Sequence, residues 1–174
     1  MQRLLHVALA WNVDLLIQGI ISGDAIVVSD GSYKGGYGTA AVILTRAAFL
    51  YKLVIQAITP GDGKDMSSYR RELSGILASM PMVDKLCQVY GIQWGSITLG
   101  CDGLSAIQEV QSVLLAIHPD TPCFDIIGAI QKLRLNSVVE WSYRYVEGHQ
   151  DEHREIDKLD IWGKLNVEAD RWAK

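Results

Sequence analysis

Four acidic residues stand at positions where a fold can bring their carboxylates together. Asp30 follows the apolar run 25–29, and Asp102 follows the run 96–101. Glu72 lies in a helical pattern between these two runs, and Asp170 lies in a helical pattern near residue 174. The ends of strands are where α/β sheets bind their ligands. If the two strands are neighbours, Asp30 and Asp102 meet, and the other two carboxylates can reach them from helices.

Carboxylates gathered in this way predict a site for divalent cations. Like charges this close cannot all stay ionised unless cations lie between them. Oxygen ligands without histidine or cysteine suit Mg²⁺ or Mn²⁺. Two such ions about 3.5–4 Å apart are the usual machinery for displacement at a phosphodiester. Each acidic residue alone also fits a turn, a helix cap or a solvated helix face, so their joint occurrence carries the hypothesis.

The elements that must position these residues can be predicted from periodicity and turn signals. Short apolar or alternating runs predict strands at 25–30, 39–44, 49–59, 96–101 and 138–146. Helical patterns cover 69–90, 104–117, 124–135 and 165–174, and Pro81 is expected to kink or end the first helix or to begin another. This order predicts an α/β fold on a mixed five-stranded sheet that opens with an antiparallel meander.

We expect residues 1–23 to form an N-terminal helical extension or the remnant of a linker, followed by a domain over residues 24–174. The N-terminal segment predicts an amphipathic helix with four apolar side chains toward a core, namely Leu5, Leu15, Leu16 and Ile20. A total of 174 residues is close to the length of one ordinary domain.

The composition excludes several classes of protein. Hydrophobic residues make up 49% and charged residues 21%, as in a packed globular chain. The net charge of −4 argues against binding a polyanion by bulk charge alone. No apolar run reaches the roughly 18 residues of a membrane span. The three cysteines are odd in number and form no CxxC pair, which predicts a reduced, intracellular setting in cytoplasm or nucleus, with no membrane partner.

Five short motifs occur along the chain, at residues 28–32 (VSDGS), 69–73 (YRREL), 98–102 (TLGCD), 146–149 (VEGH) and 166–173 (NVEADRWA). Each is weak alone, but together, in this order and on these elements, they resemble the ribonuclease H family over residues 25–174. The resemblance implies a ribonuclease H-like fold, in which the fourth and fifth predicted strands are parallel and helices flank the sheet. It also implies endonucleolytic hydrolysis of the RNA strand of RNA/DNA hybrids by two Mg²⁺ ions, for which Mn²⁺ can substitute. The products would carry 5′-phosphate and 3′-hydroxyl ends.

The resemblance assigns a role to each matching residue. Asp30 would bridge both ions, Asp170 would help to hold the ion that activates water, and Glu72 with Asp102 would hold the ion near the leaving oxygen. His149 would be a loop histidine that assists proton transfer or product release. Substrate contacts are expected from residues near this site, namely Gly31, Ser32, Ser67, Ser68, Tyr69, Arg70 and Asn166. Further phosphate contacts are expected from Lys34, Arg71 and Lys132.

The long charged loop after His149 is similar to that of ribonuclease H domains found beside reverse transcriptases in eukaryotic retroelements, which implies a reverse transcriptase domain as a partner. Ser68 and Tyr69 stand where the family often has an asparagine, and Leu104 replaces a usual polar residue. These departures leave hybrid affinity open. The alternatives are a DNA nuclease, integrase or junction resolvase of the same fold, and a catalytically weak hybrid-binding module of a retroelement polyprotein.

Overall fold

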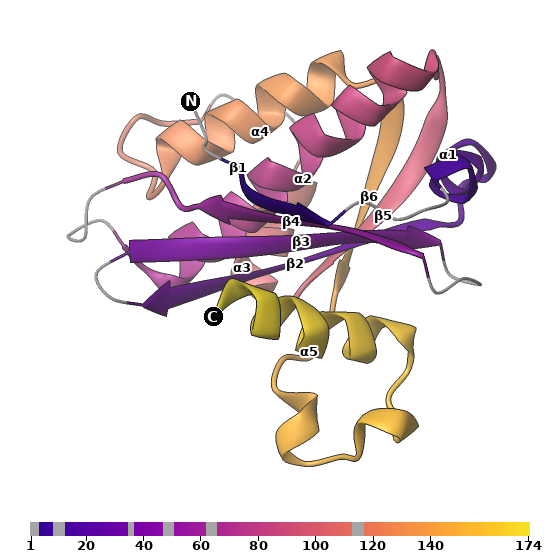
Figure 1. The fold of residues 1–174 in the computed structure, drawn as a ribbon. Helices are drawn as coiled ribbons and strands as arrows, with labels where there is room; N and C mark the ends of the chain where they lie inside the picture. The colour runs from indigo at the N-terminus through magenta and orange to yellow at the C-terminus, as the bar shows by residue number, and fades with distance from the viewer. Residues whose placement is uncertain (1–3, 9–12, 35–36, 47–50, 62–65, 113–116) are drawn as a thin grey trace.

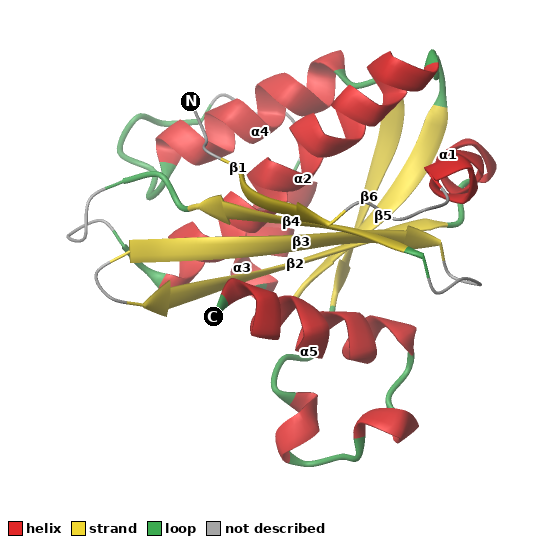
Figure 2. Ribbon diagram, viewed as in Figure 1, coloured by secondary structure: helices red, strands yellow, loops and turns green. Residues whose placement is uncertain are grey.

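A mixed six-stranded sheet with the strand order β1-β4-β3-β2-β5-β6 organises the chain. The structure is a computed structural model that describes residues 4–8, 13–34, 37–46, 51–61, 66–112 and 117–174. Helices cover both faces of the sheet (Figures 1 and 2). In chain order the elements are β1 Leu4–Ala8, α1 Val13–Ser22, β2 Ala25–Lys34, β3 Tyr37–Arg46, β4 Lys52–Ile58, α2 Ser68–Tyr90, β5 Gly95–Cys101, α3 Leu104–Gln111, α4 Phe124–Asn136, β6 Val139–Tyr145, η1 Gln150–Glu152, η2 Ile156–Lys158 and α5 Ile161–Ala173.

The five strands predicted from the sequence are β2 to β6, and their predicted directions are confirmed. β2, β3 and β4 form an antiparallel meander. β5 then pairs with β2 in parallel, and β6 pairs with β5 in parallel. The chain passes from β2 to β5 through β3, β4 and α2, and from β5 to β6 through α3 and α4, so a helix precedes each parallel strand.

The prediction of a helix over the first apolar residues is wrong, because residues Leu4–Ala8 form the strand β1. This strand pairs antiparallel with β4 and becomes the edge of the sheet. A five-residue segment of four apolar residues and His6 does not distinguish helix from strand, and the unpaired backbone groups of β4 decide the outcome. The predicted helical part lies in α1, where Leu16 and Ile20 are buried as expected and Leu15 is half-buried. The side chain of Leu5 lies outside the described part, and the division at residue 24 stays a prediction.

Three helices differ from the sequence prediction. α3 ends at Gln111 and not at residue 117, and residues 113–116 lie outside the described part. α2 continues through Pro81 to Tyr90, although proline removes one helical hydrogen bond. α5 begins at Ile161 rather than Leu165, because the carboxylate of Asp160 accepts a hydrogen bond from Gly163 N and caps the helix at 2.8 Å. Among the described helices, none has both the length and the apolar character that a bilayer crossing requires.

The sheet lies between two apolar cores, because successive side chains along each strand point to opposite faces of the sheet. Val27, Val42 and Leu44 face the larger core, which they share with α1, α2 and α4. Ile26 and Val28 face the smaller core under α5, on the opposite side of the sheet. Because the period of a strand is two, Asp30 falls on the α5 side and Ser29 on the α2 side. Each functional side chain at a strand end is therefore aimed by the core residues that precede it.

Replacing Gly100 by alanine should destabilise the protein by about 1–3 kcal/mol, because an added Cβ would lie 2.8 Å from both Trp162 Cε3 and Val146 Cγ2. The matched control is Gly128→Ala in α4, where an added Cβ has open space and a helix gains about 0.5–1 kcal/mol from alanine. Urea unfolding measures both changes. A Gly100→Ala protein as stable as the parent would contradict the packing of α5 on β5.

Candidate active site

The parallel register of β2 and β5 places two of the predicted carboxylates side by side. Val27 pairs with Leu99 and Val28 pairs with Gly100. Continuing this register by two residues sets Asp30, in the interior of β2, opposite Asp102, which directly follows β5. Asp30 is only 6% exposed, and its Oδ1 accepts a hydrogen bond of 2.6 Å from Gly31 N. The two strands are neighbours as the sequence predicted, but the expectation that Asp30 ends its strand is wrong, because pairing with β3 continues β2 to Lys34.

Two glycine contacts let α2 lie close enough to β2 for Glu72 to join this pair. A Cβ on Gly31 would lie 2.7 Å from the backbone carbon of Arg71, and one on Gly75 would lie 2.9 Å from Ser29 Cβ. The first turn of α2 is capped by Ser67, whose Oγ accepts a hydrogen bond of 3.0 Å from Arg70 N. Glu72 follows in this turn and is 9% exposed. Its carboxylate therefore comes from the α2 side of the sheet.

The fourth carboxylate comes from the opposite side of the sheet, where α5 packs on β2. Asp170 lies near the end of α5, one turn before Lys174, whose Nζ is 2.5 Å from Asp170 Oδ2. The charge of Lys174 also acts on Asp30, whose pKa it lowers in part. Lys174 is thus a cation within an otherwise acidic group.

All four carboxylates line one cavity of about 470 Å³. His149 also lines it, together with six further residues from β2, α2 and the C-terminal end of α5, namely Gly31, Ser32, Ser68, Tyr69, Arg71 and Lys174. The start of α3 closes another side of the cavity. Residues far apart in the chain therefore form one concave and strongly charged surface, as a ligand site requires.

The carboxylates repel one another strongly in this cavity. Burial, with the charges of Asp102 and Asp170, raises the pKa of Asp30 to about 7. Burial, with the charges of Asp102 and Asp30, raises the pKa of Glu72 to about 9. Without cations, these two groups hold protons at pH values where ordinary carboxyls are ionised. The cavity is therefore built for positive charge.

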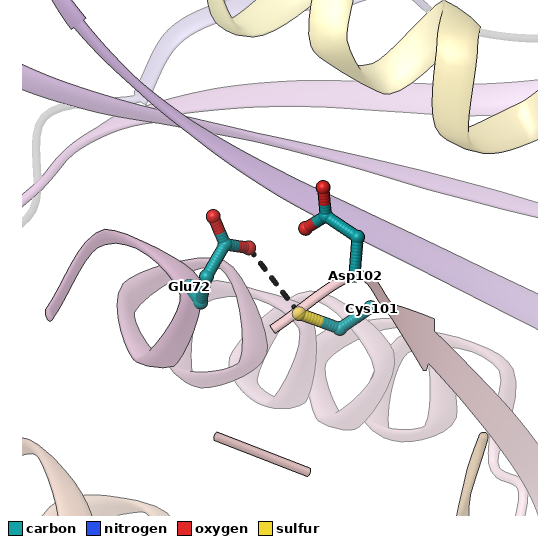
Figure 3. Close-up of side chains that lie close together, drawn as sticks. All are labelled: Glu72, Cys101 and Asp102. Atoms are coloured by element: carbon teal, nitrogen blue, oxygen red, sulfur yellow. Dashed lines mark hydrogen bonds between the residues drawn. The ribbon is translucent and has the colours of Figure 1, made fainter. Parts of the chain in front are cut away.

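The donor atoms present fit a hard divalent cation. Glu72, Cys101 and Asp102 each offer one atom, and these three atoms lie within 4.8 Å of one another (Figure 3). The two carboxylate oxygens suit a hard cation, whereas the thiol of Cys101 keeps its proton and donates to Glu72. Asp102 Oδ1 is buried and has no hydrogen-bond partner among the described residues. A buried carboxylate oxygen without a donor is costly, and a bound cation would remove that cost. The oxygen-rich set agrees with the Mg²⁺ or Mn²⁺ expected from the sequence.

His149 lies at the exposed rim of the cavity, in the loop that follows β6. Its backbone is left-handed, with φ of 53°, and its Nδ1 lies 3.4 Å from Glu152 Oε1. The preceding Gly148 touches the metal-ligand candidate directly, because a Cβ there would lie 2.5 Å from Asp102 Oδ2. The loop is thus anchored at Gly148 while the imidazole stays accessible.

Several predicted substrate residues lie elsewhere. The guanidinium of Arg70 points into the protein, where it donates to both carboxylate oxygens of Asp125 and to the carbonyl of Pro60. These hydrogen bonds occupy the guanidinium inside the protein, away from the cavity lining. Asn166 is 2% exposed on α5 and does not line the cavity either, so the structure does not bring these two residues to the site.

The other predicted contacts divide into two groups. Ser32, Ser68 and Tyr69 line the cavity, whereas Ser67 caps α2 beside it. The N–H of Gly31 donates to the carboxylate of Asp30, and Gly31 also lines the cavity. Lys132 is exposed on α4, away from the cavity lining, and the side chain of Lys34 lies outside the described part.

Two site residues were missed among the candidates. Lys174 follows Asp170 by four positions, and this helical spacing was the available signal. Cys101 precedes Asp102 and, by strand alternation, faces α2 instead of α5, where its thiol donates to Glu72 Oε2 at 3.2 Å. Burial raises the pKa of this thiol well above its usual range.

Arg71, expected only as a phosphate contact, lines the cavity while its Nε donates to Ser67 O.

Comparison with protein-family models and with curated protein sequences finds no match. Among solved structures, LC11-RNase H1 in complex with RNA/DNA hybrid aligns with a TM-score of 0.57 and 12% identity, over 86% of this chain and 99% of that chain. LC11-RNase H1 isolated from compost by a metagenomic approach aligns with a TM-score of 0.53 and 13% identity, over 87% of this chain and 99% of that chain. These alignments confirm the ribonuclease H fold.

The raised pKa values predict how the stability of the metal-free protein depends on pH. In the native state Asp30 and Glu72 bind protons up to about pH 7 and 9, whereas in the unfolded chain they release them near pH 4. The native state therefore binds more protons between these limits, so its stability falls as the pH rises from about 4 to 9. Thermal unfolding in EDTA should show the melting temperature falling over this range.

The Glu72→Gln variant cannot ionise at this position, so its free energy of unfolding should fall less than that of the parent between pH 5 and pH 9. We expect the two decreases to differ by at least about 1 kcal/mol. The control is Glu140→Gln on the exposed side of β6, which should follow the parent. If the Glu72 variant and the parent lose the same stability over this interval, the mutual repulsion described above is absent.

Proposed function

We propose that this protein hydrolyses the RNA strand of RNA/DNA hybrids, using two Mg²⁺ ions held by Asp30, Glu72, Asp102 and Asp170. The observation that carries the proposal is the convergence of four carboxylates in one cavity, two of them with pKa values raised by burial and repulsion. A fold alone does not establish an activity, whereas this constellation of ligands is specific chemistry.

The ribonuclease H fold supports the choice of substrate. LC11-RNase H1, which shares the fold over nearly its full length, was solved in complex with RNA/DNA hybrid. Each of the five sequence motifs contributes to the cavity lining either one of the four carboxylates or His149. Reaction at the RNA strand with 5′-phosphate and 3′-hydroxyl ends follows from the resemblance and is part of the proposal.

Each carboxylate has a separate task in this proposal. When bound, the two ions would supply the Lewis acidity that activates water and stabilises the leaving 3′-oxygen. Asp30, whose carboxyl is affected by the charges of both Asp102 and Asp170, would contribute to holding both ions, while Glu72 and Asp102 would hold one ion and Asp170 the other. The rigid strand ends and the two packed cores keep these oxygens in place, which limits reorganisation during the reaction.

The rim of the cavity supplies the groups that orient nucleic acid. Ser32 lies beside Asp30 and is the candidate donor or acceptor for the 2′-hydroxyl that distinguishes RNA from DNA. Ser68, Tyr69 and Arg71 form the opposite rim at the start of α2, where the DNA strand would lie. With a net charge of −4, the chain depends on such local contacts and on the bound cations.

His149 is proposed to exchange a proton with the substrate or product. Its Nδ1 is engaged with Glu152, so the exchange would take place at Nε2. The finer expectations from the loop, a retroelement origin and a neighbouring reverse transcriptase domain, stay predictions, as does a location in cytoplasm or nucleus.

Asp30→Asn should reduce cleavage to below about 1% of the parent rate, because one carboxylate is lost to both ions. Cleavage of a labelled RNA strand in an RNA/DNA hybrid, measured in Mg²⁺, gives the rate, and circular dichroism checks the fold. Asp14→Asn on the exposed side of α1 is the control and should retain parental activity. Substantial cleavage by the Asp30 variant would overturn the assignment.

The same assay on RNA/DNA, DNA/DNA and RNA/RNA duplexes tests the substrate. We expect cleavage of the hybrid alone, with the cut confined to RNA. Equal cleavage of a DNA duplex would favour a DNA nuclease, and tight hybrid binding without any cleavage would favour a binding module.

His149→Asn should slow turnover by about 10–100-fold while leaving hybrid binding unchanged, as expected for a residue that assists only proton transfer or release. Asparagine tolerates the left-handed backbone at this position, so the loop keeps its shape. His153→Asn, in the same loop but outside the cavity lining, is the control for single-turnover and steady-state measurements. If the His149 variant loses all activity, or if it loses no activity, the role proposed for His149 is wrong.

A further inference from the structure

The thiol of Cys101 is buried at the end of β5 and is directed at a candidate metal ligand. Cys101 is 0% exposed and belongs to the core that the sheet shares with α2. Its Sγ lies 3.2 Å from Glu72 Oε2, to which the thiol donates, and it accepts a hydrogen bond of 3.3 Å from Gly103 N (Figure 3). Because the thiol is fully buried, water cannot easily take over its contact with the carboxylate.

The side chain of Glu72 is held on a second side by Gly103. A Cβ on Gly103 would lie 2.7 Å from Glu72 Cγ, so the stem of the glutamate packs directly on this backbone. The second carboxylate oxygen of Glu72 points away from the sulfur (Figure 3). The strand end of β5 therefore contacts Glu72 twice, and one carboxylate oxygen remains for another partner.

We propose that Cys101 is a positioning residue for Glu72, whose thiol holds one carboxylate oxygen so that the other is presented to the divalent ion. The proposal rests on the proposed function, since it assigns a task to a residue beside the metal-ligand set. Residues that hydrogen-bond to metal ligands orient them, and their loss typically weakens metal binding by about 10–100-fold. A buried cysteine can instead act only as a small apolar side chain, and that alternative makes a different prediction.

Three variants of the full chain separate these two roles. Cys101→Ala removes the donor, Cys101→Ser keeps a hydroxyl donor at the same position, and Cys87→Ala removes a buried thiol from α2, away from the cavity. Mg²⁺ binding is measured directly by isothermal titration calorimetry, and independently as the rise in melting temperature with Mg²⁺ concentration. Neither measurement requires catalysis.

We expect Cys101→Ala to bind Mg²⁺ about 10-fold more weakly than the parent, and Cys101→Ser to stay within about 3-fold of it. Cys87→Ala should lose stability without a change in Mg²⁺ affinity. The proposal is overturned if Cys101→Ala binds Mg²⁺ as tightly as the parent, or if serine is as damaging as alanine. Hybrid cleavage is assayed separately, so a parent that binds Mg²⁺ but cuts no hybrid would refute the proposed function alone.

Discussion

The parallel pairing of β2 with β5 is the constraint on which the site depends. It sets Asp30, within β2, opposite Asp102 at the carboxyl end of β5, and the carboxyl ends of strands are where ligands of α/β sheets bind. Apolar side chains of both strands pack on the core shared with α2, and α5 packs on the opposite face of β2. The apolar residues that fix this register therefore also fix the distance between two like charges, which the carboxylates alone would increase.

The same repulsion that weakens the metal-free fold creates its affinity for cations. In the absence of ions, protons on Asp30 and Glu72 and the ammonium of Lys174 reduce the negative charge of the cavity. Divalent ions would replace these protons and neutralise the remaining carboxylates. Part of the stability supplied by the two apolar cores is thus used to hold a charged site in place, as is common where function and stability compete.

The two faces of the sheet contribute different chemistry to one cavity. From the α2 side come Glu72 and the polar rim at the start of that helix, whereas Asp170 and the loop carrying His149 come from the α5 side. Neighbouring residues on α2 have opposite tasks. Arg70 is tied to Asp125 inside the protein, and Arg71 lines the cavity, because successive residues of a helix point about 100° apart.

The sequence by itself determined the antiparallel meander and the elements that carry the four carboxylates. These features follow from local periodicity and from the residue types at strand ends, which do not depend on distant contacts. Only the tertiary structure decided that residues Leu4–Ala8 pair as an edge strand, that Arg70 and Asn166 turn inward, and that Cys101 contacts Glu72. Each of these outcomes depends on a partner far along the chain, such as β4 or Asp125, and a local pattern holds no information about which distant group will lie within hydrogen-bond reach.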